Sequence, residues 1–342
     1  MKWKFYSLAF VAGMSILTAC SSDDNNDNDG NGGNGNGNEI ENGTILKGTI
    51  TSDVTLAAGN TYKLSGEYIV EEGATLHIEE GVKIIAVYDD IADYILVKQG
   101  GKINAVGTPD KPIVMTSEKE EPGAWGGIHI CGRAHTNAEG GKGSSEIGGA
   151  VYGGNDDADN SGTLQYIRLE YTGFAFDEEH EANGISFYGV GNGTIVDHCQ
   201  AYKGSDDGFE FFGGSVNVSN LVAVSCSDDS FDWTEGWNGK GTNLVAYQEA
   251  ESTLGYDCDC LMECDNNGSN NAATPVAHPV LKNLILVGNG GSKQGIRLRA
   301  GTEVEIDNAK VCGKGQPLTV ETALTENALK NGTSKLTNIT LT

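Results

Sequence analysis

The chain has 342 residues and carries 48 Asp and Glu against 22 Lys and Arg, a formal net charge of −26. This charge excludes nucleic acid as a partner, because phosphate binding needs clustered Lys and Arg, and it favours cations or neutral ligands. With 49 glycines and only 6 prolines, the composition is typical of many tight turns between short strands. It does not fit collagen or a proline-rich linker.

The N-terminal 19 residues predict an export signal. Lys2 and Lys4 precede an apolar run over residues 5–17, which is too short to span a bilayer. The next residues, Leu-Thr-Ala-Cys at 17–20, resemble a bacterial lipobox. We therefore expect residues 1–19 to be a lipoprotein signal peptide and Cys20 to carry the lipid; an ordinary signal peptide cut after Ala19 is the alternative.

The segment after Cys20 predicts a tether. Residues 21–27, Ser-Ser-Asp-Asp-Asn-Asn-Asp, resemble the acidic export signal of Bacteroidetes surface lipoproteins. The chain then continues to residue 38 in Asn, Asp and Gly, with nothing to bury, so a disordered spacer is expected. The prediction is a lipidated tether over residues 20–43 that holds a domain, residues 44–342, at the outer membrane and outside the cell.

Internal repeats predict the architecture of this domain. The stretch GSDDGFEFFGGSVNVSNLVAVSC, from Gly204, is repeated in CSDDSFDWTEGW, from Cys226, which sets Phe211 on Trp233 at an offset of 22 residues. The preceding stretch NGISFYGVG aligns Phe187 with Phe211 at an offset of 24. Coils of 22–24 residues with alternating short strands indicate a parallel β-solenoid, in which each coil buries its apolar side against its neighbours.

The run WGGI, GGNDDADNSGTLQYIRLEY, NGISFYGVG, SDDGFEFFGG and DDSFDW resembles a family of Bacteroidetes surface lipoproteins with a pectin-lyase-like fold. The resemblance covers roughly residues 45–315. It implies an all-β, right-handed parallel β-helix and supplies no settled activity. A short helix over residues 323–330 and a final strand are expected to cap the open end of the solenoid.

Side-chain alternation divides the repeat into a lumen side and an outward side. The lumen columns are expected to hold Ile185, Phe187, Phe209, Phe211, Phe231, Trp233, Ile296 and Leu298. Two outward columns are expected on a solvent face: His129, Ser186, Glu210, Asp232 and Arg297 in one, and Cys131, Tyr188, Phe212, Thr234 and Arg299 in the other. An insertion over about residues 249–279 interrupts the series, and a coil inside it is expected to contribute Met262.

The outward columns form the candidate binding face. Parallel β-helices that process polysaccharide commonly work on such a face, so we predict glycan binding by His129, Tyr188, Glu210, Phe212, Asp232, Arg297 and Arg299. If the protein is an enzyme, Glu210, Asp232 and Arg297 are the catalytic candidates. A solvated face with charge ladders between coils is the alternative.

Two aspartate doublets, Asp206-Asp207 and Asp228-Asp229, are expected to stack at the turn that enters this face. Carboxylates one coil apart, about 4.8 Å, repel unless they bind backbone N–H groups or a metal. Three interpretations remain open: turn caps, a Ca²⁺ site, or catalytic acids. The doublets resemble those of parallel β-helix glycosidases, but the chain lacks the paired Gly-His-Gly motif of those enzymes.

A second acidic segment, Asp157-x-Asp159-x-Ser161-Gly162, fits the first half of a calcium loop. The twelfth position would be Arg168 rather than Glu, which excludes an EF-hand. Asp157 and Asp159 are therefore either Ca²⁺ ligands or part of a polar turn.

Of the eight cysteines, Cys258, Cys260 and Cys264 cluster in the insertion. A disulfide that fixes this loop is expected in preference to zinc, because the spacing is not that of a CxxC finger. The function predicted from the sequence is a cell-surface lipoprotein that binds glycan, with Ca²⁺ as the candidate cofactor. The alternatives are a polysaccharide lyase or glycoside hydrolase, and a structural subunit or adhesin that contacts another outer-membrane protein.

Overall fold

The computed structural model describes residues 38–89, 91–177 and 180–342. The chain divides into a first unit, residues 1–35, and a second unit, residues 36–342, which contains all of these described residues. The predicted signal peptide, the lipidation site Cys20 and most of the predicted tether lie outside the described residues. Within those residues, no helix is long and apolar enough to cross a membrane.

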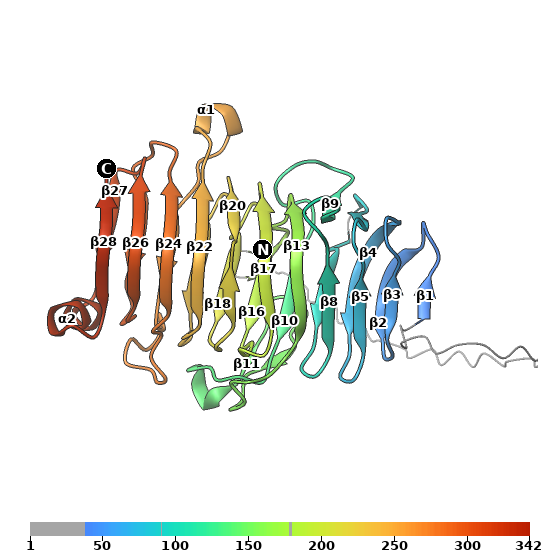
Figure 1. The fold of residues 1–342 in the computed structure, drawn as a ribbon, viewed down its shortest axis with the longest axis horizontal. Helices are drawn as coiled ribbons and strands as arrows, with labels where there is room; N and C mark the ends of the chain where they lie inside the picture. Colours follow the sequence, from blue (N-terminus) through green and yellow to red (C-terminus); the bar gives the residue numbers. More distant parts are fainter. Residues whose placement is uncertain (1–37, 90, 178–179) are drawn as a thin grey trace, which may run out of the picture. The chain divides into compact units, whose positions relative to one another are not determined.

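The second unit is a right-handed parallel β-helix, which confirms the predicted fold class. Its main sheet has 24 strands in the described residues, and they stack coil upon coil along the long axis of Figure 1. The pairings form three parallel ladders. The first and second ladders share six long strands: β13 (Gly162–Glu170), β17 (Ile195–Tyr202), β22 (Lys240–Tyr247), β24 (Val280–Val287), β26 (Glu305–Cys312) and β28 (Lys335–Leu341).

The remaining strands each belong mainly to one ladder. The first ladder adds β1 (Asn38–Ile40), β3 (Val54–Leu56), β5 (Thr75–Ile78), β8 (Lys102–Val106) and β19 (Asn217–Ser219). The second adds β6 (Lys83–Ala86), β9 (Ile113–Ser117) and β20 (Val222–Val224). Two strands, β2 (Ile45–Ile50) and β4 (Thr61–Val70), run on from the second ladder into the third.

The third ladder is the one that carries the predicted binding face. It consists of β7 (Tyr94–Val97), β10 (Ile128–Cys131), β16 (Ile185–Tyr188), β18 (Phe209–Phe212), β21 (Phe231–Thr234), β23 (Met262–Cys264), β25 (Gln294–Leu298) and β27 (Gln316–Val320). Among the described residues, pairing already includes Asn38, because β1 pairs with β3, so the solenoid extends into the segment that the sequence assigns to the tether.

Short elements interrupt the coils. Two antiparallel pairs stand outside the main sheet: β11 (Gly143–Ser144) with β12 (Val151–Tyr152), and β14 (Ala175–Asp177) with β15 (His180–Glu181). A 3-10 turn covers Glu139–Gly141, α1 covers Glu251–Leu254 and α2 covers Ala323–Asn331. Helix α2 lies beside the last strand, β28, at one end of the stack (Figure 1). This confirms the predicted terminal helix and final strand.

The corner between the first two ladders depends on a single residue per coil. Seven successive coils place a non-glycine residue there with a φ between 51° and 61°: Tyr166, His198, Asn220, Asn243, Asn283, Asn308 and Asn338. Asparagine tolerates this left-handed conformation better than most residues. Its amide also donates a hydrogen bond to the asparagine of the preceding coil, as from Asn243 Nδ2 to Asn220 Oδ1 at 2.9 Å. The asparagine repeated at this corner therefore fixes both the bend and the stacking of the coils.

The lumen confirms the predicted register. Every residue that we assigned to the lumen columns is buried, and Met262 pairs with Ile296 as expected. Phe187 stacks on Phe211 with ring centroids 5.0 Å apart and planes 9° apart. Phe211 also stacks on Trp237 at 4.2 Å. The apolar period of the sequence thus forms one continuous core, and its outward partners must point to the other side of the sheet.

Candidate functional site

The outward column of the third ladder runs in the order that the sequence predicts, with one addition. His129 pairs with Ser186, Ser186 with Glu210, and Glu210 with Asp232. Glu263 comes next and separates Asp232 from Arg297. The sequence analysis missed Glu263 because 31 residues separate it from Asp232, whereas the preceding coil has only 22. The alternation Leu261-Met262-Glu263-Cys264 was the signal that could have identified it.

Part of the predicted solvent face is covered. A second apolar cluster lies outside the lumen and includes Tyr188, Phe212 and, from the loop over residues 132–155, Ile147 and Tyr152. Tyr152 packs on Tyr188 with ring centroids 5.2 Å apart. The prediction that His129, Tyr188 and Phe212 face solvent is therefore wrong, since their exposed fractions are 0%, 1% and 8%. The loop supplies apolar side chains that bury this end of the face.

The surroundings of His129 indicate a role in packing rather than in ligand binding. Its Nε2 lies 2.6 Å from the carbonyl oxygen of Gly126. Burial lowers the pKa of His129 to about 4, so the ring is neutral at pH 7. It packs edge-on against Tyr94, with ring centroids 6.1 Å apart, which makes it part of the packing under the covering loop.

The uncovered part of the face is a pocket that we call the acidic cavity. It has a volume of about 300 Å³ and is lined by ten carboxylates and one guanidinium. The carboxylates are Glu146, Glu181, Asp206, Asp207, Glu210, Asp228, Asp229, Asp232, Asp259 and Glu263, and the guanidinium is that of Arg297. All four doublet aspartates thus lie together with Glu210 and Asp232, as the repeat predicted. Glu146 comes from a loop, Glu181 from strand β15 and Asp259 from the insertion, and no pattern in the sequence pointed to them.

The second aspartate of each doublet caps the next coil. Asp207 Oδ1 accepts the backbone N–H of Asp229 at 2.8 Å, and Asp229 Oδ1 accepts that of Cys260 at 2.6 Å. Asn183 Oδ1 starts the series by accepting the N–H of Asp207 at 3.2 Å. These bonds give Asp207 and Asp229 the role of turn caps. Each carboxylate has a second oxygen, so capping does not prevent the same residue from binding a cation.

Burial and mutual repulsion raise the pKa values of carboxyl groups in the acidic cavity. Burial, and then the charge of Asp228, raise the pKa of Asp206 to about 8. Burial is also the main cause that raises the pKa of Glu146 to about 7. The pKa values of Asp207, Glu210, Asp229 and Asp232 rise well above their ordinary range, first through burial and then through the neighbouring carboxylates. In the absence of a cation, the cavity holds protons at neutral pH.

The nearby arginines are already paired. Arg297 binds Glu263 at 2.9 Å and Glu321 at 3.0 Å, and Arg299 binds Asp265 at 2.7 Å and also contacts Glu263. The hydrogen bond from Arg297 to Glu321 raises the pKa of Arg297 further. At Arg299, burial lowers the pKa of the guanidinium, but the hydrogen bond to Asp265 raises it. Arg297, one of the three catalytic candidates, therefore cannot serve as a base, and neither can Arg299, because neither gives up its proton.

Groups of carboxylate oxygens in the acidic cavity are close enough to share a cation. Three groups bring one oxygen from each of three residues within 4.8 Å of one another: Asp206, Asp207 and Asp228; Asp207, Glu210 and Asp232; and Asp229, Asp232 and Glu263. Asp232 Oδ1 is buried and has no hydrogen-bond partner within the described residues. A buried acceptor without a donor is costly. A divalent cation with oxygen ligands would remove this cost.

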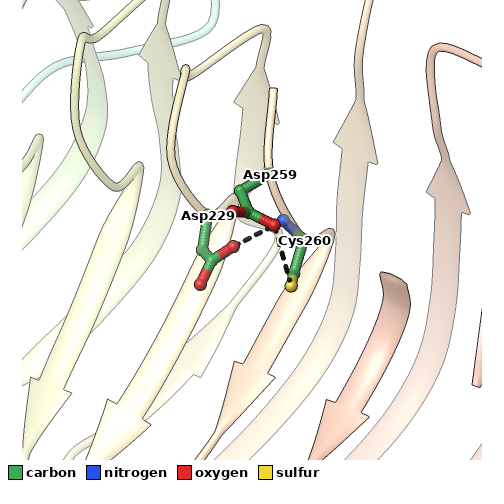
Figure 2. A group of neighbouring side chains, drawn as sticks. All are labelled: Asp229, Asp259 and Cys260. Atoms are coloured by element: carbon green, nitrogen blue, oxygen red, sulfur yellow. Dashed lines mark hydrogen bonds between the residues drawn. The ribbon is translucent and has the colours of Figure 1, made fainter. Parts of the chain in front are cut away.

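A fourth group contains a thiol, as Figure 2 shows: Asp229, Asp259 and Cys260. The Cys260 thiol donates to Asp259 Oδ1 at 3.4 Å. Burial is the main cause that raises the pKa of this thiol. Sulfur is a soft ligand that suits zinc or copper, whereas Ca²⁺ prefers oxygen. We therefore exclude Cys260 from the candidate cation sites.

The expected disulfide in the insertion is wrong. Cys258, Cys260 and Cys264 are free thiols, as are the other cysteines in the described part of the chain. Cys264 belongs to the lumen core, and Cys260 occupies the position that Asp229 holds one coil earlier. The strand register of the third ladder therefore separates these side chains, and β pairing rather than a disulfide fixes the insertion.

The second acidic segment takes no part in the acidic cavity. Asp157 Oδ1 lies 2.7 Å from His135 Nδ1, and Asp159 Oδ2 accepts the backbone N–H of Arg133 at 3.1 Å. Within the residues that the structure describes, neither belongs to a group of three potential ligands. The contacts favour the alternative in which Asp157 and Asp159 stabilise a polar turn.

Similarity to known proteins identifies the family of the chain. The catalytic domain of a GH87 alpha-1,3-glucanase in complex with tetrasaccharides is 11% identical, with a TM-score of 0.31, and the match covers 83% of this chain and 63% of that one. The Dettilon tailspike protein is 9% identical, with a TM-score of 0.27, over 79% of this chain and 62% of that one. This chain thus matches less than two thirds of either structure. Comparison with curated proteins gives no match. The model of the pectate-lyase-like beta helix domain family matches residues 48–342, and the chain belongs to this family.

Proposed function

We propose that this β-helix binds divalent cations, Ca²⁺ foremost, in the acidic cavity and binds glycan through them. The observation that carries the proposal is the lining of the cavity, in which ten carboxylates face one guanidinium. That guanidinium, of Arg297, is already paired with Glu263 and Glu321. Oxygen-only ligands in a partly open site suit Ca²⁺, which takes about 6–8 of them.

Glycan is the ligand class that fits the acidic cavity once a cation is bound there. Carboxylates accept hydrogen bonds from sugar hydroxyls, and a cation held on one side by protein retains coordination positions for hydroxyl oxygens. The excess of negative charge disfavours a polyanionic glycan, so a neutral glycan is the expected ligand. Membership of a pectate-lyase-like family supports this choice of ligand, although a fold by itself does not specify an activity.

Glycan binding is expected to depend on Ca²⁺. An array of neutral glycans should show binding in millimolar Ca²⁺ that chelator abolishes. Asp232→Asn should weaken it at least about tenfold, or 1.4 kcal/mol, because Asp232 belongs to two of the oxygen groups. Asp110→Asn is the matched control, since Asp110 is exposed and lies outside the cavity. If no glycan binds in either condition and cross-linking on cells captures one outer-membrane protein, the structural or adhesin alternative replaces this proposal.

Glycoside hydrolysis is a second candidate, and one observation favours it. Oxygens of Glu210 and Asp232 lie within 4.8 Å of each other, and retaining glycosidases also act through two neighbouring carboxyl groups. Both carboxyl groups have raised pKa values, as a general acid requires. Release of reducing ends by the wild type, and its loss in Glu210→Gln, would establish this activity. A lyase is disfavoured because Arg297 and Arg299 cannot act as bases.

We also propose that Cys20 tethers the domain to the outer membrane at the cell surface, as in the Bacteroidetes surface lipoproteins that the sequence resembles. Cys20→Ala is expected to move the protein from the membrane fraction to the soluble fraction, because the variant cannot carry the lipid anchor. Fractionation followed by immunoblotting measures this. Retention of the variant on membranes would contradict the tether, and protease treatment of whole cells tests exposure at the surface.

A further inference from the structure

A second pocket, which we call the aromatic pocket, combines exposed rings with charged groups. It lies where the connections that follow β6, β9 and β13 come together. Its volume is about 350 Å³, within the range of about 300–1,000 Å³ that is usual for ligand sites. Tyr88 and Phe174 supply its rings, and Asp89, Lys119 and Glu121 supply its charged groups.

The rings at this pocket are accessible and are held in place by their neighbours. Tyr88 is 57% exposed, and Lys119 Nζ donates to its hydroxyl at 3.0 Å. Phe176 is 46% exposed. It packs edge-on against Phe174, with ring centroids 5.1 Å apart, and against the buried Tyr94 at 6.2 Å. Rings that are positioned before a ligand arrives lose little conformational freedom when it binds.

The aromatic pocket and the acidic cavity adjoin. Gly123 lines the pocket, and a Cβ at this position would lie 2.8 Å from Ser205 Oγ. Ser205 directly precedes Asp206, which lines the cavity. The hairpin β14–β15 also joins the two, because it carries Phe176 on β14 and the cavity residue Glu181 on β15. One ligand of more than a single sugar unit can therefore contact both.

We propose that the aromatic pocket is a second glycan subsite, in which Tyr88 and Phe176 stack on a pyranose ring of the same chain that enters the acidic cavity. This rests on the proposed glycan binding and adds a subsite and a preference for longer, neutral chains. The faces of aromatic rings are partly negative and attract the C–H groups of a pyranose, and the contact also buries apolar surface.

The charged groups of the pocket favour the same ligand. Lys119 pairs with Glu121 at 2.9 Å, and Asp89 Oδ1 accepts the backbone N–H of Ile91 at 2.8 Å. The ammonium group is thus already matched by a carboxylate, which leaves no excess of positive charge to attract an anionic sugar. Carboxylate oxygens and an ammonium group exchange hydrogen bonds with sugar hydroxyls, so a neutral glycan satisfies both the rings and their rim.

Ligand length tests this inference on the full-length mature chain. The probes are linear neutral gluco- and manno-oligosaccharides, from disaccharide to hexasaccharide, and isothermal titration calorimetry in millimolar Ca²⁺ measures each Kd. In the wild type, the hexasaccharide of the series that binds should have a Kd at least about tenfold below that of the disaccharide. Tyr88→Ala should lose this gain and keep the affinity for the disaccharide. Tyr88→Phe, which keeps the ring, should retain most of the gain.

Tyr247→Ala is the matched control. Tyr247 is 47% exposed on β22 and lines neither the aromatic pocket nor the acidic cavity, so this variant should keep the full gain with length. Phe176→Ala should reduce the gain, as Tyr88→Ala does. Circular dichroism checks that each variant is folded.

The subsite and the cation-dependent binding fail in different ways. Equal affinity of the wild type for disaccharide and hexasaccharide, or a full gain in both Tyr88→Ala and Phe176→Ala, would overturn the aromatic subsite and leave Ca²⁺-dependent binding intact. Binding that chelator leaves unchanged, with a gain that Tyr88→Ala removes, would support the subsite and overturn the role of the cation. No binding of any neutral glycan would overturn both.

Discussion

Replacing Phe211 with alanine is expected to lower the free energy of unfolding by about 3–5 kcal/mol, through lost burial and the cavity left behind. Phe211 is 2% exposed and stacks between Phe187 and Trp237, with ring centroids at 5.0 Å and 4.2 Å. Parallel pairing holds the strands of Phe187 and Phe211 in place, so the lumen has little freedom to collapse into the space. Urea unfolding, followed by tryptophan fluorescence and circular dichroism, measures the loss.

Phe176→Ala is the matched control for this change. Phe176 is 46% exposed and belongs to the small pair β14–β15 outside the main sheet, so its loss should cost less than about 1 kcal/mol. If Phe211→Ala is as mild as the control, the stacked rings do not form the rigid core that the coils indicate. Coincident transitions by the two probes are needed, because solenoids can unfold in parts.

In the absence of a divalent cation, the free energy of unfolding is expected to fall as the pH rises from about 4 to about 8. The folded state keeps protons on Asp206 and Glu146, whose pKa values are raised to about 8 and about 7. The unfolded state has lost these protons above about pH 4. The folded state therefore binds more protons in this window, and raising the pH favours unfolding. Each such group contributes up to about 1.4 kcal/mol per pH unit between its two pKa values.

Ca²⁺ is expected to restore most of the free energy of unfolding that is lost as the pH rises. An ion that binds only the folded state stabilises it by about 2.7 kcal/mol at a hundredfold excess over its Kd, so at pH 8 the Tm should rise with Ca²⁺ and fall with chelator. The double variant Asp207→Asn, Asp229→Asn should lose the response. It keeps the Oδ1 acceptors that bind the N–H groups of Asp229 and Cys260. Thermal unfolding at pH 5 and pH 8, in Ca²⁺ and in chelator, measures both effects.

An unchanged Tm at pH 8 in Ca²⁺ and in chelator would contradict the cation proposal. Asp207 and Asp229 would then act as turn caps alone, and cation-dependent glycan binding would lose its basis. The pH effect is separable from this outcome, because it depends on burial of the carboxyl groups whether or not a cation binds. A Tm that rises with pH in chelator would instead show that these carboxylates are ionised and compensated within the fold.

Seven of the eleven residues that line the acidic cavity could be predicted from the sequence: the four doublet aspartates, Glu210, Asp232 and Arg297. Asp206, Asp207, Asp228 and Asp229 repeat at an offset of 22 residues, and parallel coils place equivalent positions on top of each other. The same repeat puts Glu210 beside Asp232. Glu263 was missed because the insertion lengthens its coil. The contributions of Glu146 and Glu181 depend on segments outside the repeat, which follow no period.

The sequence by itself determined the β-helix, its lumen and the direction in which each side chain leaves the strand. These follow from local alternation and from a repeat that every coil obeys, so no long-range information was needed. Only the tertiary structure decided which outward residues meet solvent. The loop over residues 132–155 folds back and packs Ile147 and Tyr152 on Tyr188 and Phe212. Alternation distinguishes the two faces of a sheet. The path of an irregular loop depends instead on how the loop packs against the rest of the fold, and here that packing leaves the carboxylates in a cavity.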